Sequence, residues 1–336
     1  MHQFNYYLYH YLQMKVIGVA CGGYTSEREI SLKSGNLIFN LIKDSKFECY
    51  KIDVNNNKYT VIDKFENNFL LNKKNFRFVK NDLSISFDYI INLVHGSPGE
   101  DGKITKKLED LGISHSTCNS STAELTFNKK KCTEIAKKIG IKTAKSLLIK
   151  KNHDFSEKEI GDKIGFPCFV KPNQSGSSFG ISKVYHQKEM KPAIIKALKE
   201  DNEIIIESYL NGREVTVGVY KLNGKVEVLP ITEIVSENDF FDYKAKYEGE
   251  SDEITPAILP IELERKVKKD ALNLYNKLNL RGITRSEFIF KKNIPYLLEI
   301  NTIPGMTEKS IIPQQFKAAN KNLKKIILAM INEGLK

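Results

Sequence analysis

Apolar runs alternate with amphipathic segments along the first part of the chain. The apolar run at residues 16–20 precedes a glycine pair and a helical segment near Ser26, and a second run at 89–94 precedes the glycine-rich stretch 95–102. Strands that alternate with helices predict an open α/β sheet, and such sheets bind ligands in the loops at the strand ends. Ser26 and Glu29 have the spacing of a capping box, so we expect Ser26 to be the N-cap of the first helix.

The remainder of the chain predicts a mixture of strands and helices. A helix is expected from about residue 119 to 139, and a buried strand at 167–172 opens a β-rich region. A helix near 264–278 carries apolar residues at helical spacing on one face, which predicts a core stripe: Val267, Ala271, Leu274 and Leu278. The other expected elements are strands at 204–207, 215–220 and 225–229, a polar stretch at 236–255, a hairpin at 284–301 and a C-terminal helix.

The hairpin at 284–301 is the most informative pattern for chemistry. If it is centred on Asn293, Glu287 lies opposite Glu299 and Arg285 lies opposite Asn301. Side chains alternate along a strand, so these four polar groups share one face. The sequence therefore predicts a polar cluster built from two neighbouring strands.

The same register has a consequence for charge. Phe288 and Leu298 would pair on the other face and enter the core. Two carboxylates directly opposite each other repel, whereas a divalent cation between them reverses the sign of that interaction. Glu287, Glu299 and Asn301 offer hard oxygen ligands, which suit Mg²⁺ that also contacts a phosphate. We favour this metal site over the alternative, a surface hairpin with solvated acids.

Two loops and one histidine are weaker candidates. The Gly/Ser loop at 171–180 leaves a buried strand and begins with Lys171, so it can cradle phosphate, although an ordinary flexible loop fits nearly as well. The Pro-Gly turn within 301–307 can bring a backbone N–H into the site as an oxyanion donor, or be a simple turn. His95 can act as a base or be a hydrogen-bonded loop residue.

Composition narrows the function classes. The chain has 336 residues, 41% of them hydrophobic, which suits a folded protein of two or three domains. The formal charge of +11 comes mainly from scattered lysines without interleaved aromatics, so a solvated basic surface is favoured over nucleic-acid binding. No apolar run is long enough to span a membrane. Five widely spaced cysteines without a C-x-x-C predict free thiols and a cytoplasmic setting.

Together these segments resemble the D-alanine–D-alanine ligases, a branch of the ATP-grasp superfamily. The resemblance runs from about Lys15 to the C-terminus and rests on six separated motifs in the family's order. They lie at residues 22–29, 95–102, 171–178, 241–247, 285–287 and 298–307.

The resemblance implies the ATP-grasp fold. This comprises an N-terminal open parallel α/β domain at 14–127, a small central α+β domain at 128–210 and a C-terminal α+β domain at 211–336, with residues 1–13 as an extension of unassigned structure. It implies ATP-dependent joining of two D-alanines for peptidoglycan through an acyl phosphate, with two Mg²⁺ ions that Mn²⁺ can replace. The implied partners are D-alanine and ATP, without nucleic acid or membrane, and the family also suggests a homodimer.

The resemblance also assigns roles by motif. Glu27 would hold the ammonium of the first D-alanine, supported by Ser177 and Tyr247, with His95 beside the substrate. Arg285 and the Gly305 N–H would stabilise the oxyanion, and Ser310 would receive the second substrate's carboxylate. ATP would be bound by Lys129, Lys171, Glu207, Tyr209, Leu210, Glu214 and Lys246, and the metal ions by Glu287, Glu299 and Asn301.

Three alternatives stay open at this point. The enzyme could join D-alanine to D-lactate or D-serine, although Tyr247 resembles the dipeptide-forming members. It could be another ATP-grasp ligase for a carboxylate and an amine, or a nucleotide-binding module without catalysis. Glu287 stands where many relatives carry aspartate, which still allows metal ligation but can shift metal preference.

Overall fold

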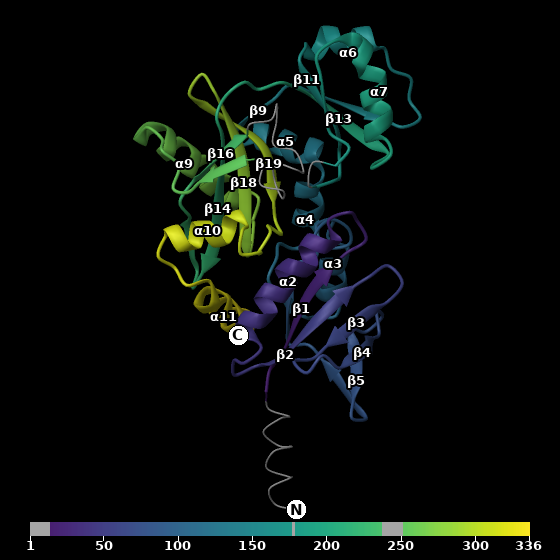
Figure 1. Ribbon diagram of the computed structural model, residues 1–336, viewed down its shortest axis with the longest axis vertical. Helices are drawn as coiled ribbons and strands as arrows, with labels where there is room; N and C mark the ends of the chain where they lie inside the picture. The colour runs from purple at the N-terminus through teal and green to yellow at the C-terminus, as the bar shows by residue number, and fades with distance from the viewer. Residues whose placement is uncertain (1–13, 177–178, 237–250) are drawn as a thin grey trace, which may run out of the picture.

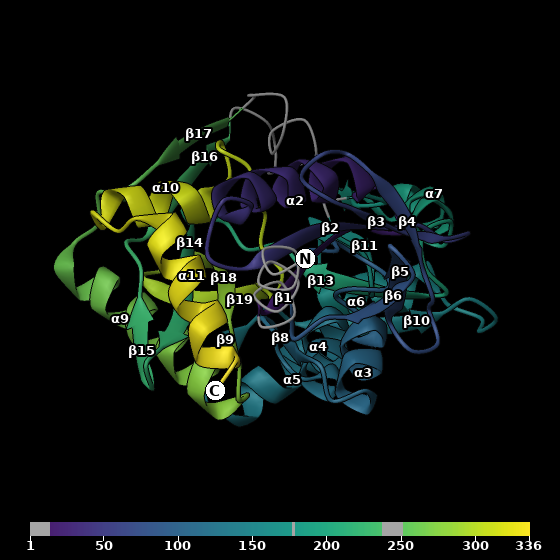
Figure 2. The same ribbon diagram turned by 90° about the horizontal axis from the view of Figure 1, so that it is seen from below.

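The computed structural model describes residues 14–176, 179–236 and 251–336. Its three larger sheets form three lobes, with the central lobe at the top of Figure 1 and the N-terminal and C-terminal lobes below it. Seen from below, the C-terminal helices lie beside the first helix of the N-terminal lobe (Figure 2). Within these residues, no helix combines the length and the apolar character needed to cross a membrane.

The N-terminal lobe is a six-stranded sheet with a parallel centre. Its strand order is β4 (Asn68–Leu71), β3 (Tyr59–Ile62), β2 (Glu48–Val54), β1 (Val16–Gly22), β7 (Tyr89–Asn92) and β8 (Ser114–His115). The last four strands in this order run parallel, as predicted, whereas β3 and β4 are antiparallel. The connections from β2 to β3 and from β3 to β4 are short, and short connections allow only antiparallel neighbours, which explains why these two edge strands are antiparallel. A separate hairpin, β5 (Arg77–Lys80) and β6 (Leu83–Ser86), completes this lobe.

The first helix, α2 (Arg28–Ile42), starts later than the sequence predicts, and the capping box is wrong. Its N-cap is Glu27, whose side chain makes no capping hydrogen bond. The guanidinium of Arg28 binds Asp53 at 2.7 and 2.9 Å and the Val54 carbonyl at 2.8 Å. This ties the first turn to the end of β2 and leaves the Glu27 carboxylate for another environment.

The helix predicted at 119–139 is two helices, α4 (Ser120–Phe127) and α5 (Lys129–Lys138). They are separated by Asn128, whose backbone is extended and whose side chain accepts a hydrogen bond from Lys131 N at 2.9 Å. Such capping by Asn is what starts a new helix. The break therefore puts Lys129 at a helix N-terminus, where the lobes meet.

The central lobe is an antiparallel sheet covered by helices. Its order is β10 (Ser146–Lys150), β13 (Glu203–Ser208), β11 (Cys168–Pro172) and β12 (Ser182–Val184), and it packs against α6 (Glu157–Ile164) and α7 (Gln187–Ala197). This agrees with the α+β character expected for this segment.

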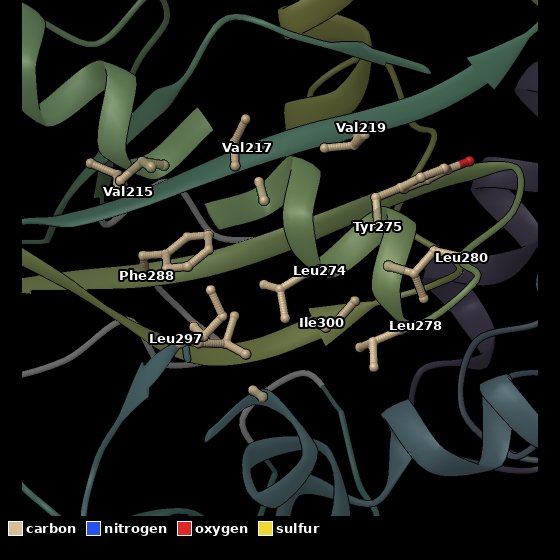
Figure 3. Packing of buried hydrophobic residues seen from close by; sticks show 14 of the residues in the cluster. Val215, Val217, Val219, Leu274, Tyr275, Leu278, Leu280, Phe288, Leu297 and Ile300 are labelled. Carbon is tan, nitrogen blue, oxygen red and sulfur yellow. The ribbon is translucent and has the colours of Figure 1, made fainter. Parts of the chain in front are cut away.

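The C-terminal lobe contains the longest strands. Its sheet has the order β17 (Ser251–Ile254), β16 (Thr232–Ser236), β14 (Glu214–Leu222), β18 (Ile283–Lys291), β19 (Ile294–Asn301) and β9 (Lys142–Thr143), with β15 (Lys225–Val228) paired to β14. Helix α9 (Ile261–Lys277) buries its predicted stripe against one face, where Leu274 and Leu278 meet Val217 and Ile300 (Figure 3). The same core includes residues of α5 and Ile141 just before β9, although we expected these segments in the central domain.

The single C-terminal helix that we expected is two, α10 (Ile311–Ala318) and α11 (Leu323–Gly334). Helix α10 lies on the face of β14 opposite α9, where Phe316 packs against Tyr220 at 5.2 Å between ring centroids. Helix α11 contacts α2, and together they join the C-terminal lobe to the N-terminal one.

Candidate active site

The β18–β19 hairpin places the polar cluster as predicted. Arg285 lies opposite Asn301 and Glu287 lies opposite Glu299. The predicted pairing of Phe288 with Leu298 is wrong, because Phe288 pairs with Leu297. These two residues are buried at 0% and 1% exposure.

Phe288 pairs with Leu297 instead of Leu298 because of the turn and a β-bulge. The turn residues Lys292 and Asn293 have positive φ angles of 51° and 60°, typical of a tight two-residue hairpin turn. This turn alone would set a register that separates the two glutamates. A bulge after Glu287 takes up the one extra residue and restores the polar pairing.

Each of the two opposed carboxylates lies beside a cation. Arg285 Nη1 is 2.5 Å from Glu287 Oε1, and Lys129 Nζ is 3.3 Å from Glu299 Oε2. Lys129 Nζ also donates to the Ser175 carbonyl at 2.6 Å. The repulsion expected between two acids across a ladder is therefore offset by positive charge from Arg285 on the same strand and from Lys129 on α5.

The lobes meet at a polar pocket. Seven of the predicted residues line it: Glu27, His95, Lys129, Arg285, Glu299, Asn301 and Gly305. The pocket also includes residues to which the sequence analysis gave no role, namely Glu100, Thr126, Phe127, Ser175, Gly176, Ile300 and Thr302. Glu100, Ser175 and Gly176 stand in the loops that the sequence singled out, whereas no pattern marks Thr126 or Phe127.

Two glycine-containing loops approach the Glu27 carboxylate. A Cβ atom at Gly176 would lie 2.5 Å from Glu27 Oε1, and one at Gly96 would lie 3.2 Å from Glu27 Oε2. A side chain at Gly176 would displace the Glu27 carboxylate, and one at Gly96 would first meet Thr25 Oγ1 at 2.5 Å, so glycine permits this close approach. Glu27 is consequently 8% exposed, held between the N-terminal and central lobes.

His95 forms a buried pair with Glu100. Its Nδ1 atom is 3.8 Å from Glu100 Oε1, and its Nε2 atom has no hydrogen-bond partner within the described residues. Burial acts to lower the pKa of His95, but Glu100 and then Glu27 outweigh it, so this pKa is raised above its ordinary value. The arrangement favours an imidazolium that faces the pocket.

We expect Glu100→Gln to lower the pKa of His95. In the wild-type protein the raised pKa contributes stability that is complete below the unfolded value of about 6.5 and is lost as the pH rises through the folded value. An NMR titration of the histidine ring, assigned with His95→Gln, measures the midpoint. His115, which lies 4.0 Å from Glu109, serves as the internal control and keeps its midpoint. An unchanged His95 midpoint would remove Glu100 as the cause.

A second charged pair lies on the neighbouring sheet. Lys171 Nζ donates to Glu207 Oε2 at 3.0 Å, and both side chains are largely buried. Burial acts to lower the pKa of Lys171, but Glu207 and, less strongly, Glu299 and Glu214 raise it. The pKa of Lys171 is therefore raised by carboxylates of both the central sheet and the C-terminal lobe.

The other predicted ATP-binding residues follow Glu207 along the chain. The Tyr209 ring lies 6.1 Å from the Phe169 ring and 4.3 Å from Lys183 Nζ, and Leu210 is buried. Glu214 is the first residue of β14, an interior strand of the C-terminal sheet that pairs with β16 and β18. This segment links the central and C-terminal lobes.

Ser310 and Gly305 are neighbours at the start of α10. Ser310 Oγ accepts from Thr307 N at 3.0 Å, and a Cβ atom at Gly305 would lie 2.9 Å from that oxygen. Ser177, Lys246 and Tyr247, also predicted for the site, lie outside the described residues.

The donor set of the hairpin can be tested against a divalent cation. Apart from its ion pair with Arg285, the buried Glu287 Oε1 atom has no hydrogen-bond partner in the described part of the chain, and Asn301 Oδ1 accepts only from Ile303 N there, at 2.9 Å. No group of three or more His, Cys, Asp or Glu side chains gathers in this part of the chain. Two carboxylates and an amide fit Mg²⁺ or Mn²⁺ that takes its remaining ligands from phosphate and water.

Comparisons with known proteins agree with this architecture. Models of the family described as D-ala D-ala ligase match its N-terminus at residues 16–118 and its C-terminus at residues 135–332. A curated D-alanine–D-alanine ligase from Flavobacterium johnsoniae is 47% identical over 322 residues, which cover 96% of this chain and 100% of that protein.

Two solved structures extend the comparison. VanG D-Ala:D-Ser ligase from Enterococcus faecalis has a TM-score of 0.84 at 28% identity and covers 96% of this chain and 100% of that one. A D-alanine–D-alanine ligase from Bacillus anthracis complexed with ATP has a TM-score of 0.75 at 29% identity, over 96% and 97% of the two chains. On the family models and the curated relative, with the three-lobed structure in agreement, this chain belongs to the D-alanine–D-alanine ligase family and has its ATP-grasp fold.

Proposed function

We propose that this protein joins two D-alanines to D-alanyl-D-alanine at the expense of ATP, for peptidoglycan precursor synthesis. The observation that carries the proposal is the polar pocket, where Glu27, Arg285 and Lys129 of three separate segments of the chain converge. The chain belongs to the D-alanine–D-alanine ligase family, which gives this pocket its context. A site for phosphoryl transfer followed by aminolysis needs bound cations and accurate positioning, and this pocket supplies both.

Nucleotide binding is proposed at the junction of the central and C-terminal lobes. Lys129 and Lys171 contact the phosphates, and Lys246 reaches the γ-phosphate. The adenosine is held by Glu207, Tyr209, Leu210 and Glu214. Glu287, Glu299 and Asn301 hold two Mg²⁺ ions, which neutralise phosphate oxygens when bound. Support for this arrangement comes from the buried Lys171–Glu207 pair, whose lysine also senses Glu299.

The first chemical step takes place beside Glu27. Glu27, with Ser177 and Tyr247, holds the ammonium of the first D-alanine, and His95 lies beside the substrate. One carboxylate oxygen of this D-alanine attacks the γ-phosphorus of ATP, the bond to ADP breaks, and D-alanyl phosphate forms. The raised pKa of His95 and the burial of Glu27 suit a zwitterionic substrate.

The second step forms the peptide bond. The neutral amine of the second D-alanine, whose carboxylate is received by Ser310, attacks the carbonyl carbon of D-alanyl phosphate. Arg285 and the Gly305 N–H stabilise the oxyanion that develops. The amine loses a proton, the bond to phosphate breaks, and inorganic phosphate leaves with the dipeptide as second product.

The decisive assay uses the purified full chain with ATP, Mg²⁺ and D-alanine. We expect ADP, phosphate and dipeptide in equal amounts, with L-alanine inert and D-lactate a poor competitor. The proposal fails if ADP forms without dipeptide. All five cysteines are buried free thiols, which fits the proposed cytoplasmic setting, and a homodimer is proposed from the family.

Replacing Tyr247 tests the choice of acceptor. By resemblance, its hydroxyl orients Glu27, so Tyr247→Phe should remove one hydrogen bond worth about 0.5–1.5 kcal/mol and loosen the site without destroying it. Dipeptide synthesis should fall while the D-lactate product appears, mostly at low pH, where the amine is protonated.

The product ratio with both acceptors present, at two pH values, measures this effect. The matched control is Tyr185→Phe on the central lobe, an exposed tyrosine outside the pocket, which should leave the ratio unchanged. If the wild-type enzyme makes mainly the D-lactate product at neutral pH, the dipeptide assignment is wrong and the D-alanine–D-lactate ligase replaces it. A preference for D-serine would instead point to the activity named for VanG.

A further inference from the structure

A buried threonine on β14 holds the guanidinium of Arg285. Thr216 has 0% exposure, and Arg285 Nη1 donates to its Oγ1 atom at 2.9 Å. Thr216 lies directly opposite Glu287 in the β14–β18 ladder, so its side chain is on the same face as Glu287 and Arg285. Neither the sequence pattern nor the proposed reaction gives this residue a role.

The Thr216 hydroxyl donates one hydrogen bond and accepts another, and its partners fix which is which. Its proton is donated to the Ser286 carbonyl at 3.2 Å. A hydroxyl has one proton and two lone pairs, so committing the proton to Ser286 turns a lone pair toward Arg285. Thr216 is therefore set up as an acceptor for this cation.

The backbone around Thr216 is braced by Gln315 of α10, a glutamine with 0% exposure. Its Nε2 atom donates to the Thr216 carbonyl at 3.0 Å and to Thr232 Oγ1 at 3.0 Å, and its Oε1 atom accepts from Gly218 N at 2.9 Å. A Cβ atom at Gly218 would lie 2.6 Å from that oxygen, so glycine is required there for this approach.

The hydrogen bonds of Gln315 lie where β14 has no strand partner on one side. On this edge of β14, pairing with β16 ends at Thr216 and pairing with β15 begins at Val219. Gln315 supplies hydrogen bonds in the interval between them, where the strand would otherwise be less constrained. The position of Thr216 is thus fixed through both its main chain and its side chain.

The geometry points to Thr216 as a positioning residue that orients Arg285 for the reaction, with Gln315 holding Thr216 in place. This inference rests on the proposed function, in which Arg285 stabilises an oxyanion. Among the described residues, Arg285 also pairs with Glu287, a proposed metal ligand, and an acceptor with a further negative charge at the position of Thr216 would reduce the positive charge offered to the oxyanion. A neutral acceptor holds the guanidinium without that loss.

The first test compares Thr216→Val with Thr216→Ser in the full chain. The valine has a similar shape but no acceptor, so we expect kcat to fall about 10- to 100-fold with KM for ATP within about twofold. The serine keeps the hydroxyl and should recover most of kcat. Thr284→Val is the matched control, because Thr284 is equally buried on β18 and donates to Val219 O instead of contacting Arg285.

A double-mutant cycle separates positioning from a general packing effect. If Thr216 acts through Arg285, the Thr216→Val change should cost little additional kcat in an Arg285→Lys background. Additive losses, or equal losses in the valine and serine variants accompanied by a lower melting temperature, would identify Thr216 as merely structural and overturn the inference.

The second test reads the position of Arg285 without any substrate. The chain has six arginines, so the side-chain NMR spectrum of isotope-labelled arginine is simple, and Arg285→Lys identifies the Arg285 signal. We expect slow rotation of this guanidinium in the wild type and Thr216→Ser, and faster rotation in Thr216→Val. Fast rotation in all three refutes the inference. A wild type that makes no dipeptide refutes the proposed function alone, since the NMR result stands without it.

Discussion

Glu287→Gln and Glu299→Gln should each reduce turnover by at least about 10²–10³-fold, because a neutral amide in place of a charged carboxylate leaves the site with too little negative charge to retain two divalent cations. The effect on stability should differ between them. Glu287 is 4% exposed and lies 2.5 Å from Arg285, whose side chain is 12% exposed, whereas Glu299 is more exposed and lies 3.3 Å from Lys129. Only Glu287→Gln should therefore lower the melting temperature clearly.

Turnover is measured by the release of dipeptide and phosphate, and stability by the melting temperature. Metal binding is measured with Mn²⁺ in the presence of ADP. The matched control is Glu264→Gln on α9, whose carboxylate pairs with Lys268 at the surface and should change none of them. Glu299→Gln is the sharper variant, because lost turnover in a protein of unchanged stability isolates the role in binding metal. Near-wild-type turnover in both variants would refute the metal site.

Lys171→Met should weaken ATP binding and also destabilise the fold. The lysine side chain is 15% exposed and its Glu207 partner 7%, so the substitution leaves a buried carboxylate without its partner, which costs about 3–5 kcal/mol. The raised pKa of Lys171 means that its contribution is complete below the unfolded value of about 10.4 and is lost only as the pH rises through the folded value. The loss of stability should thus be the same at pH 6 and pH 8.

Urea unfolding and calorimetric titration with ATP measure these effects. Lys150→Met provides the control on the same sheet, because Lys150 is 56% exposed and its pair with Glu203, at 3.1 Å, should contribute about 0–1 kcal/mol. If both variants lost equal stability, burial would not be the cause. A stable Lys171→Met protein with normal ATP affinity would contradict the proposed nucleotide site.

The hairpin shows how far the sequence could be taken and where it stopped. Alternation along two strands was enough to predict that Arg285, Glu287, Glu299 and Asn301 share one face, and the structure has them so. The pairing of Phe288 could not be predicted, because it depends on a bulge that a pattern with period two does not show. The break at Asn128 was missed for a related reason, since helical periodicity continues across it.

The sequence by itself determined the alternation of strands and helices, the polar face of the hairpin, the core stripe of α9 and, through ordered motifs, the family, although not the points at which single helices divide in two. These properties follow from the spacing of residues along the chain, which fixes the face that each side chain occupies. Only the tertiary structure decided which charges meet, because Lys129 and Glu299, Glu27 and Gly176, and Thr216 and Arg285 come from segments far apart in the chain. Such contacts depend on how the lobes pack against one another, and no local pattern records them.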